Sequence, residues 1–396
     1  MKIGMILDYT FPPDPRVENE AVSLIVAGHE VFLFCLTYGG EMLNEEINSI
    51  KVCRYKSNRL EYKMSALAYT LPVYTHLMSK KIKHFIERYT IEAIHIHDIR
   101  IAEAVFKVNK NKKLPTVLDL HDNLPEVMKL YPHLQKFPGK YIISPKKWKQ
   151  KEEEFINRAT KVITVSQEFV EEVLDRTKLP KEKMVLVPNT VRKSFYKDAV
   201  VMPELLAKYK NNFVVLYLGD THVRRGLLTA IRSIRFVKDK IPNLKLVIVG
   251  SNTTDTVLKN EVIKEEVKTF VDFEGWQNMS LFPSYIEASS VCISPLRRNK
   301  QHDVAYANKV FQYMSFKKPL LVSDATAQKN LVEKVGAGVV HKEQDAQDFA
   351  EKLLELYNNQ ELSDQMGAKG KAFVENEFSW EETSKNLVHL YDKLQD

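Results

Sequence analysis

Short apolar runs alternate with amphipathic stretches along most of the chain. In the first half, apolar runs predict strands over residues 2–7, 30–36, 50–55, 91–97, 116–120, 161–165 and 184–187. Most of them are nearly continuous, which is typical of strands buried on both faces of a parallel sheet. Between the first two runs, apolar residues recur at helical spacing over residues 17–27. This order of strand, helix and strand predicts a parallel sheet with right-handed crossovers.

The second half repeats the same alternation. Strands are predicted over residues 213–218, 244–249, 270–273, 291–294 and 320–323, and helices over 226–240, 255–268, 279–288, 307–316, 345–357 and 380–394. Two consecutive series of this kind predict an α/β protein with two doubly wound, Rossmann-like domains that face each other across a cleft.

A polar, proline-containing connection separates the two series. It contains Pro188 and Asn189, and we place the hinge near residues 190–200. The expected parts are a first Rossmann-like domain over residues 1–190, a second one over 191–378, and a C-terminal helix over 379–396 that packs back toward the first domain.

A strand, a turn and a helix near the middle of the chain form a place to hold an anion. The apolar run over residues 214–218 ends at Gly219, and Arg224, Arg225 and Gly226 precede the next helical pattern. A helix N-terminus offers unpaired N–H groups and a partial positive charge, and guanidinium groups add forked donors for phosphate oxygens. The alternative interpretation is two solvated arginines in front of an ordinary helix.

Length, charge and cysteine content narrow the class of protein. The 396 residues carry a formal net charge of +7, which suits phosphate-bearing ligands or an anionic membrane but falls short of a nucleic-acid-binding signature. Cys35, Cys53 and Cys292 lie in or beside apolar runs, so we expect buried thiols in a reducing compartment. No run approaches the roughly 20 apolar residues of a membrane span, and the first residues form a strand pattern rather than a signal peptide. We expect a cytoplasmic protein, soluble or peripheral on the inner face of the membrane.

Two longer segments, residues 58–88 and 123–151, do not fit a minimal strand–helix alternation, and both are basic and aromatic. In the second segment, Lys136, Lys140, Lys146, Lys147, Lys149 and Lys151 interleave with Phe137, Tyr141, Ile142, Ile143 and Trp148. Such a mixture can rest on an anionic leaflet, where each cation contributes about 1 kcal/mol. The alternative is a solvated helix face beside a small core.

Five stretches, in this order, are similar to the motifs of one enzyme family. They are Pro12 to Val17 leading through Glu20 and Ala21 to Gly28 to Val31, Asp119 to Asp122 with Pro125 and Glu126, Pro188 with Asn189, Gly219 to Gly226, and Ala307 to Met314 running on to Lys318 and Pro319. With them the sequence resembles the retaining glycosyltransferases of family 4 (glycosyl transferases group 1), which have the GT-B fold. The resemblance covers essentially the whole chain, and it implies that residues 1–190 form the acceptor-side domain and residues 191–378 the nucleotide-sugar-binding domain.

The resemblance implies a role for each matching residue. Arg225 and Lys309 would bind the diphosphate of a nucleotide sugar, where fixed cations lower the barrier as charge builds on the leaving group. His121 would contact the transferred sugar and the reaction centre. Further donor-binding residues would be Gly219, Arg224, Gly226, Asn308 and Gln312, and acceptor-side residues would be Asp122 and Glu126. His97 and Asp98 are acceptor-side candidates because they end the preceding strand; the alternative for both is a purely structural role.

Three positions depart from the family pattern. Gln312 and Val304 stand where the family has glutamates, and Asp220 stands where an arginine often follows the turn glycine. Loss of a charged acceptor for the ribose hydroxyls would cost on the order of 1–2 kcal/mol. A degenerate relative that binds a nucleotide or glycan, or scaffolds a partner, is therefore an alternative. A nucleotide-sugar epimerase of the same architecture is another, whereas a dehydrogenase is disfavoured because no G-x-G-x-x-G follows the first strand.

The reaction that the resemblance implies is transfer of a sugar from a nucleotide sugar to a glycan or lipid-linked acceptor, with retention at the anomeric carbon. The leaving diphosphate would take the proton of the acceptor hydroxyl, and the pathway would be surface polysaccharide or glycoconjugate biosynthesis. No Asp-x-Asp metal clamp is present, and Asp272 and Glu274 are expected to face solvent from a strand. We expect no obligatory metal or other cofactor and no nucleic-acid partner, and contact with an anionic membrane is a further expectation.

Overall fold

The chain forms two compact units in a computed structural model that describes residues 1–131, 134, 136–137 and 139–395. Unit 1 comprises Met1–Asn189 and Ser384–Asp396, and unit 2 comprises Thr190–Thr383. The C-terminal segment thus joins unit 1 only from Ser384, whereas the sequence analysis begins that segment at residue 379.

Unit 1 is built on an eight-stranded sheet. Its strands are β1 (Lys2–Ile6), β2 (Glu30–Thr37), β3 (Asn44–Ile47), β4 (Ile50–Lys56), β5 (Ala93–His97), β6 (Thr116–Leu120), β7 (Lys161–Thr164) and β8 (Met184–Leu186). They lie in the order β3-β4-β2-β1-β5-β6-β7-β8, and all neighbours are parallel except β3 and β4. The strand order reverses between β1 and β5, and doubly wound sheets bind ligands at the carboxyl ends of strands at such a point.

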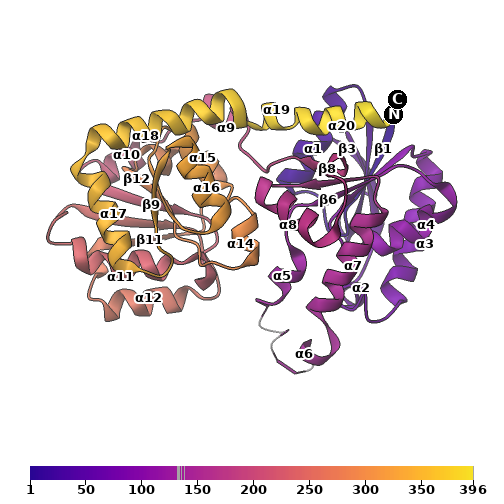
Figure 1. The fold of residues 1–396 in the computed structure, drawn as a ribbon, viewed down its shortest axis with the longest axis horizontal. Coiled ribbons are helices and arrows are strands. Elements are labelled where there is room, and N and C mark those ends of the chain that lie inside the picture. Colours follow the sequence, from indigo (N-terminus) through magenta and orange to yellow (C-terminus); the bar gives the residue numbers. More distant parts are fainter. Residues whose placement is uncertain (132–133, 135, 138, 396) are drawn as a thin grey trace. The chain divides into compact units, whose positions relative to one another are not determined.

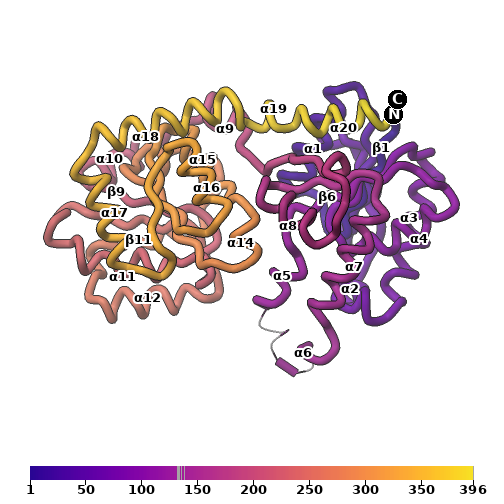
Figure 2. Tube along the Cα trace, in the orientation of Figure 1, coloured from indigo at the N-terminus to yellow at the C-terminus, as the bar shows by residue number. Residues whose placement is uncertain are grey.

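The helices of unit 1 cover this sheet (Figure 1). They are α1 (Pro15–Val26), α2 (Arg59–Ser65), α3 (Val73–Tyr89), α4 (Ala102–Lys112), α5 (Leu124–Met128), α6 (Gly139–Ile142), α7 (Pro145–Arg158), α8 (Gln167–Thr177) and α20 (Lys385–Gln395), with a short 3-10 turn, η2 (Lys181–Lys183). Helices α3, α4 and α7 pack side by side, and α20 returns from the far end of the sequence to pack against α1 and β8 (Figure 2). The Asp14, Ser144 and Ser166 side chains cap the first turns of α1, α7 and α8.

Unit 2 contains a six-stranded parallel sheet. Its strands are β9 (Phe213–Leu218), β10 (Leu244–Val249), β11 (Val271–Gly275), β12 (Val291–Ser294), β13 (Leu320–Ser323) and β14 (Gly338–His341), in the order β11-β10-β9-β12-β13-β14. Here the strand order reverses between β9 and β12. The carboxyl ends of these two strands are therefore where a ligand of this unit is expected to bind.

The helices of unit 2 lie between and after these strands. They are α9 (Lys193–Lys197), α10 (Pro203–Tyr209), η3 (Val223–Arg225), α11 (Leu227–Val237), α12 (Asp255–Lys264), η4 (Lys268–Phe270), η5 (Met279–Leu281), α13 (Phe282–Glu287), α14 (Lys300–Val304), α15 (Lys309–Ser315), α16 (Thr326–Val335), α17 (Ala346–Asn358), α18 (Gln360–Phe373), η6 (Val374–Phe378) and α19 (Trp380–Thr383). Strand β9 is buried on both faces, because Val215 and Tyr217 join one apolar core and Val214, Leu216 and Leu218 join another.

Two parallel-sheet α/β units confirm the predicted fold class. Every predicted strand is found within two residues of its expected ends. Strands β3 and β14 and, in unit 2, helices α9, α10, α14, α16 and α18 were missed; β3 reads Asn-Glu-Glu-Ile and carries no apolar run. The helix predicted over residues 279–288 begins as the 3-10 turn η5, and the one predicted over 380–394 is divided into α19 and α20.

The expectation that Glu274 faces solvent is wrong. Its side chain on β11 is only 15% exposed, because it accepts hydrogen bonds from Lys208, Tyr209 and Tyr285 at 2.6, 2.9 and 2.8 Å. These partners use both carboxylate oxygens. The three cysteines are buried and unpaired, as predicted.

Candidate active site

A glycine-bounded turn follows β9 at the point of strand reversal in unit 2. Gly219 and Gly226 have φ angles of 110° and 79°, which favour glycine. A Cβ on Gly226 would lie 1.7 Å from the carbonyl oxygen of Pro295, just after β12, so no other residue fits there without a shift of the backbone. Arg297 also donates its backbone N–H to the carbonyl oxygen of Arg224, at 3.1 Å. The turn is thus built against the segment that follows β12.

Lys309 reaches this turn from the start of α15. Its Nζ lies 3.5 Å from the centroid of the Tyr217 ring and 3.4 Å from the position of a Cβ on Gly219. Within the described ranges, Nζ has no hydrogen-bonding or ion-pairing partner. Burial, followed by the charge of Arg225, lowers the pKa of Lys309 well below its ordinary value. A bound anion would reverse that effect, because it would stabilise the charged ammonium.

Asp220 is part of the turn and holds Arg225. Its carboxylate accepts hydrogen bonds from the His222 backbone N–H at 3.1 Å and from Asn252 Nδ2 at 2.7 Å, and pairs with Arg225 Nε at 3.2 Å. Burial opposes ionisation of Asp220, but these contacts lower its pKa. The pairing uses one edge of the guanidinium, which leaves the terminal nitrogens for another acceptor. Arg224 is more loosely placed, with Nη2 4.0 Å from Asp220 Oδ2.

The other predicted donor-binding residues lie on or beside α15. Gln312 is half-buried and three residues after Lys309, so both side chains lie on one face of the helix. Asn308 is exposed and immediately precedes α15. Val304 is 8% exposed at the end of α14, where its apolar side chain packs into the protein.

In unit 1, His121 lies between two carboxylates. It follows β6, and its Nδ1 is 3.2 Å from Asp119 Oδ2, while Nε2 is 3.2 Å from Oδ2 of Asp98, which follows β5. Burial opposes a charge on the imidazole, but Asp98 and Asp119 outweigh it and raise the pKa of His121 to about 10. Burial also raises the pKa of Asp98 to about 7, although His121 pulls it down. His121 is therefore an imidazolium at neutral pH and still 23% exposed.

Asp119 is held by a buried arginine from the first helix. Arg16 Nε and Nη2 donate to the two Asp119 oxygens at 2.9 and 2.6 Å, and Nη2 lies 2.8 Å from Glu20 Oε1. Burial by itself would raise the pKa of Asp119, but Arg16 and the donors around it hold that pKa well below its usual range. The result is a charged carboxylate in the core that orients His121.

Two further histidines extend this cluster into the core. His97, which is 1% exposed, has Nδ1 3.4 Å from Asp119 Oδ2, and burial together with His95 lowers its pKa. His95 Nε2 lies 3.2 Å from Glu20 Oε2, and its Nδ1 is 3.0 Å from the hydroxyl of Tyr391 on α20. The proposed acceptor-side role of His97 therefore needs correction: its side chain supports Asp119 and is closed off from solvent.

The remaining acceptor-side residues, Asp122 and Glu126, have different surroundings. Asp122 is exposed and close enough to Asp98 to raise its pKa. Glu126 on α5 pairs with Lys129, with Nζ 2.7 Å from Oε2, and makes no ion pair with His121 in the part of the chain described. The structure thus brings His121, Asp98 and Asp122 together and gives Glu126 a local partner.

Sequence reasoning assigned no role to several residues of this cluster. Arg16, Glu20 and Asp119 lay inside quoted motifs, yet only their packing shows that they support His121. At the strand reversal of unit 1, Asp8 after β1 pairs with Arg100 after β5, with Arg100 Nε 3.1 Å from Oδ2. The sequence feature that could have pointed to this ion pair is the carboxylate of Asp8, which directly follows the first predicted strand.

The buried cluster also contains the donor types of a metal site. Potential ligand atoms of Glu20, His95, His97 and Asp119 lie within 4.8 Å of one another. However, Arg16 already places a cation between the two carboxylates. A divalent ion at this place would be repelled by the guanidinium, so the arrangement fits an ion-pair cluster better than a metal centre.

Among the described residues, none of the helices combines the length and apolar character that crossing a bilayer requires.

Two α/β units, each with charged side chains at its strand reversal, define a GT-B glycosyltransferase fold, and comparison with known proteins agrees. Sucrose-phosphate synthase from Thermosynechococcus elongatus has a similar fold, with a TM-score of 0.79 and 18% identity, over 99% of this chain and 98% of that one. HepE of Anabaena, solved in complex with UDP, has a TM-score of 0.75 at 15% identity, over 99% of this chain and 100% of that one.

The sequence comparisons identify the family. The model described as "Glycosyltransferase Family 4" matches residues 16–195, and the model described as "Glycosyl transferases group 1" matches residues 202–373. An uncharacterised glycosyltransferase of Methanocaldococcus jannaschii is 24% identical over 318 residues, which is 79% of each chain. The capsular polysaccharide biosynthesis glycosyltransferase CapM of Staphylococcus aureus is 24% identical over 252 residues, 59% of this chain and 62% of that one. The chain belongs to the group 1, family 4 glycosyltransferases.

Proposed function

We propose that this glycosyltransferase moves a sugar from a nucleotide sugar to a glycan or lipid-linked acceptor, with retention at the anomeric carbon, in surface polysaccharide or glycoconjugate biosynthesis. One observation carries the proposal. Lys309 Nζ lies over the Tyr217 ring beside Gly219, and no carboxylate of the described chain pairs with it. The UDP complex of HepE and the capsular role in the name of CapM support a nucleotide sugar and a polysaccharide acceptor.

In the proposed reaction, unit 2 stabilises the leaving group. As the bond between the anomeric carbon and the diphosphate breaks, negative charge grows on the phosphate oxygens. Lys309 and the free edge of Arg225 bind these oxygens, while Gln312 on the same face of α15 contacts the ribose hydroxyls. Arg224, Asn308 and the backbone at Gly219 and Gly226 complete the donor site.

Unit 1 acts on the sugar and the acceptor. The His121 imidazolium, held at its two ring nitrogens by Asp98 and Asp119, contacts the transferred sugar beside the reaction centre and stays protonated throughout. The acceptor hydroxyl oxygen forms the new bond to the anomeric carbon. The proton of that hydroxyl passes to an oxygen of the leaving diphosphate. Because the acceptor attacks from the face of the sugar that the diphosphate leaves, the configuration at the anomeric carbon is retained. Asp122 and Glu126 contribute to acceptor binding.

We propose that this chemistry needs no metal. The charge that a divalent ion would supply to the diphosphate comes from Lys309 and Arg225, and Glu274, on the strand that carries the acidic pair, already has partners for both oxygens. Transfer should therefore continue in a chelator.

The test is binding followed by transfer. Nucleoside diphosphates with different bases, and their sugars, are screened by thermal shift with chelator present. A ligand at 100 times its dissociation constant stabilises by roughly 2.7 kcal/mol, which moves the melting temperature visibly. Lys309→Met should weaken binding of the responding nucleotide about 10–100-fold, because a hydrogen bond to a charged group contributes about 1.5–3 kcal/mol. Lys334→Met removes an exposed lysine of the same unit and serves as the control.

The outcome also separates the alternative functions. Transfer to an acceptor that is lost in Lys309→Met supports the proposal, and the anomeric configuration of the product tests retention. Nucleotide binding without transfer would favour the degenerate relative. The Asp220–Arg225 pair is the observation in its favour, since the Asp220 carboxylate offsets part of the positive charge that would act on the phosphate. An isomerised donor without any acceptor would favour the epimerase.

A further inference from the structure

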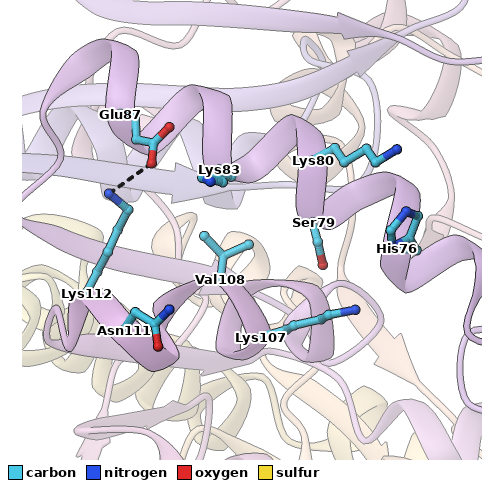
Figure 3. Close-up of a pocket in the computed structure, with 9 residues that line it drawn as sticks. All are labelled: His76, Ser79, Lys80, Lys83, Glu87, Lys107, Val108, Asn111 and Lys112. Atoms are coloured by element: carbon cyan, nitrogen blue, oxygen red, sulfur yellow. Dashed lines mark ion pairs between the residues drawn. The ribbon is translucent and has the colours of Figure 1, made fainter.

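A basic groove lies between α3 and α4 in unit 1, away from the His121 cluster. Its volume is about 440 Å³, and it is lined by His76, Ser79, Lys80, Lys83, Glu87, Lys107, Val108, Asn111 and Lys112 (Figure 3). The Lys112–Glu87 pair, with Nζ 3.3 Å from Oε1, crosses the groove at one end. His76, Lys80 and Lys107 lie toward the other end (Figure 3).

The groove has a local excess of positive charge. One glutamate faces four lysines, and Lys80, Lys83 and Lys107 are exposed and have no ion pair within the described residues. Lysines from two helices that converge without a counter-ion attract an anion from solution. The hydroxyl of Ser79 already donates its proton to the Thr75 carbonyl oxygen at 2.6 Å, so it is not a donor for an anion in the groove.

Exposed apolar side chains adjoin the N-terminal end of α3. Leu71 and Val73 are 49% and 44% exposed. Thr70 Oγ1 donates to the Ile142 carbonyl oxygen at 2.9 Å, which holds α6 beside them. On α6, Tyr141 and Ile142 are 77% and 43% exposed. An apolar tip thus lies next to the end of the groove where the lysines lack partners.

We infer that this face docks on an anionic phospholipid bilayer, with a lipid phosphate in the groove between Lys80 and Lys107 and the apolar tip in the interfacial layer. The apolar tip favours a membrane over a soluble phosphate, since a bilayer takes up exposed apolar side chains beside its anionic headgroups, whereas a free phosphate ion leaves them in water. The groove also differs from the donor site of unit 2, so the inference stands independently of the proposed reaction.

The structure corrects which lysines of the basic segment serve this contact. Lys149 pairs with Glu152 and Glu172 at 3.1 and 3.0 Å, and Lys151 pairs with Glu103 at 2.9 Å, so both are neutralised within the fold. Trp148 is 3% exposed and belongs to the core. The exposed side chains of that segment include Tyr141 and Ile142 on α6, and Lys146 and Lys147 in the first turn of α7.

The test is co-sedimentation of the full chain with vesicles of equal parts phosphatidylglycerol and phosphatidylcholine. The groove variant carries Lys80→Gln, Lys83→Gln and Lys107→Gln. Its matched control carries Lys240→Gln, Lys268→Gln and Lys334→Gln, three exposed lysines of unit 2 that lose the same charge. A lysine near an anionic surface contributes about 1 kcal/mol. Since about 1.4 kcal/mol is tenfold, the groove variant should bind about a hundredfold more weakly.

The inference holds if the wild type sediments with the anionic vesicles, the control does so equally, and the groove variant does not. It is overturned if the wild type fails to bind, if the groove variant binds like the wild type, or if both variants weaken alike, which would indicate net charge alone. The double variant Leu71→Ser with Tyr141→Ser should reduce vesicle binding without any change in charge. Unchanged binding would overturn the proposed insertion of the apolar tip into the bilayer. Coincident melting temperatures show that the variants are folded.

Discussion

His121 should lose much of its positive charge at alkaline pH when Asp98 is replaced by Asn. In the wild type, the two carboxylates raise the pKa of His121 from 6.5 to about 10. At about 1.36 kcal/mol per pKa unit, this rise corresponds to roughly 5 kcal/mol. Asp98 and Asp119 lie at the same distance, 3.2 Å, from the two ring nitrogens. The charge of Asp98 is the largest single cause that raises this pKa, because Arg16 already neutralises Asp119.

Asp98→Asn keeps the shape and an oxygen acceptor but removes the charge. We therefore expect the pKa of His121 to fall by roughly 2 units. The assay is a pH titration of the histidine ring nitrogens by NMR, with His121 assigned through its loss in His121→Gln. Asp122→Asn is the matched control, because Asp122 is exposed and influences Asp98 rather than His121.

The sign of the linked stability change follows from the same values. A histidine whose pKa is raised on folding stabilises the protein fully below its unfolded pKa, and this contribution disappears as pH rises through the folded value. The wild type should lose this stability as pH approaches about 10. In Asp98→Asn the loss should come roughly 2 pH units earlier. A His121 pKa that moves by less than about half a unit, or equally in Asp122→Asn, would refute the assignment of the charge to Asp98.

Three further predictions concern Arg16 and the donor site. Arg16→Met should lower the free energy of unfolding by about 3–5 kcal/mol in urea titrations, because two buried carboxylates lose their cation; a loss below about 1 kcal/mol would contradict the ion-pair account. Gly226→Ala should weaken nucleotide binding and lower the melting temperature more than Gly275→Ala, since a Cβ at 226 meets the Pro295 oxygen at 1.7 Å whereas one at 275, with φ of 67°, meets nothing within 4 Å. Nucleotide affinity should fall as pH rises through the lowered pKa of Lys309, because binding must then add a proton to Lys309, whereas phosphates stay ionised above about pH 7. Calorimetric titrations test this slope, which Lys309→Met should abolish.

Much of the fold could be predicted because a buried strand or helix face shows in the local pattern of apolar residues. A strand covered on both faces, such as β9, must be apolar at consecutive positions, and the run from Val214 to Leu218 shows it. The same logic fails for β3, whose polar residues pair only with β4. An edge strand depends on hydrogen bonds from its neighbour more than on apolar side chains, so its sequence carries little signal.

The sequence by itself also determined where phosphate chemistry is expected, because a glycine turn with arginines between a strand and a helix is local. What it left open is which charges act together. Arg16 and Asp119 are separated by 103 positions. Lys309 meets Tyr217 only because β12, which precedes α14 and α15 in the chain, pairs with β9 in the sheet. Asp119 lay in a predicted strand and a quoted motif without a role of its own, yet its buried carboxylate, together with Asp98, keeps His121 charged. Local periodicity follows from which face of an element is buried, whereas the pKa values and partners of a site depend on contacts that only tertiary packing creates.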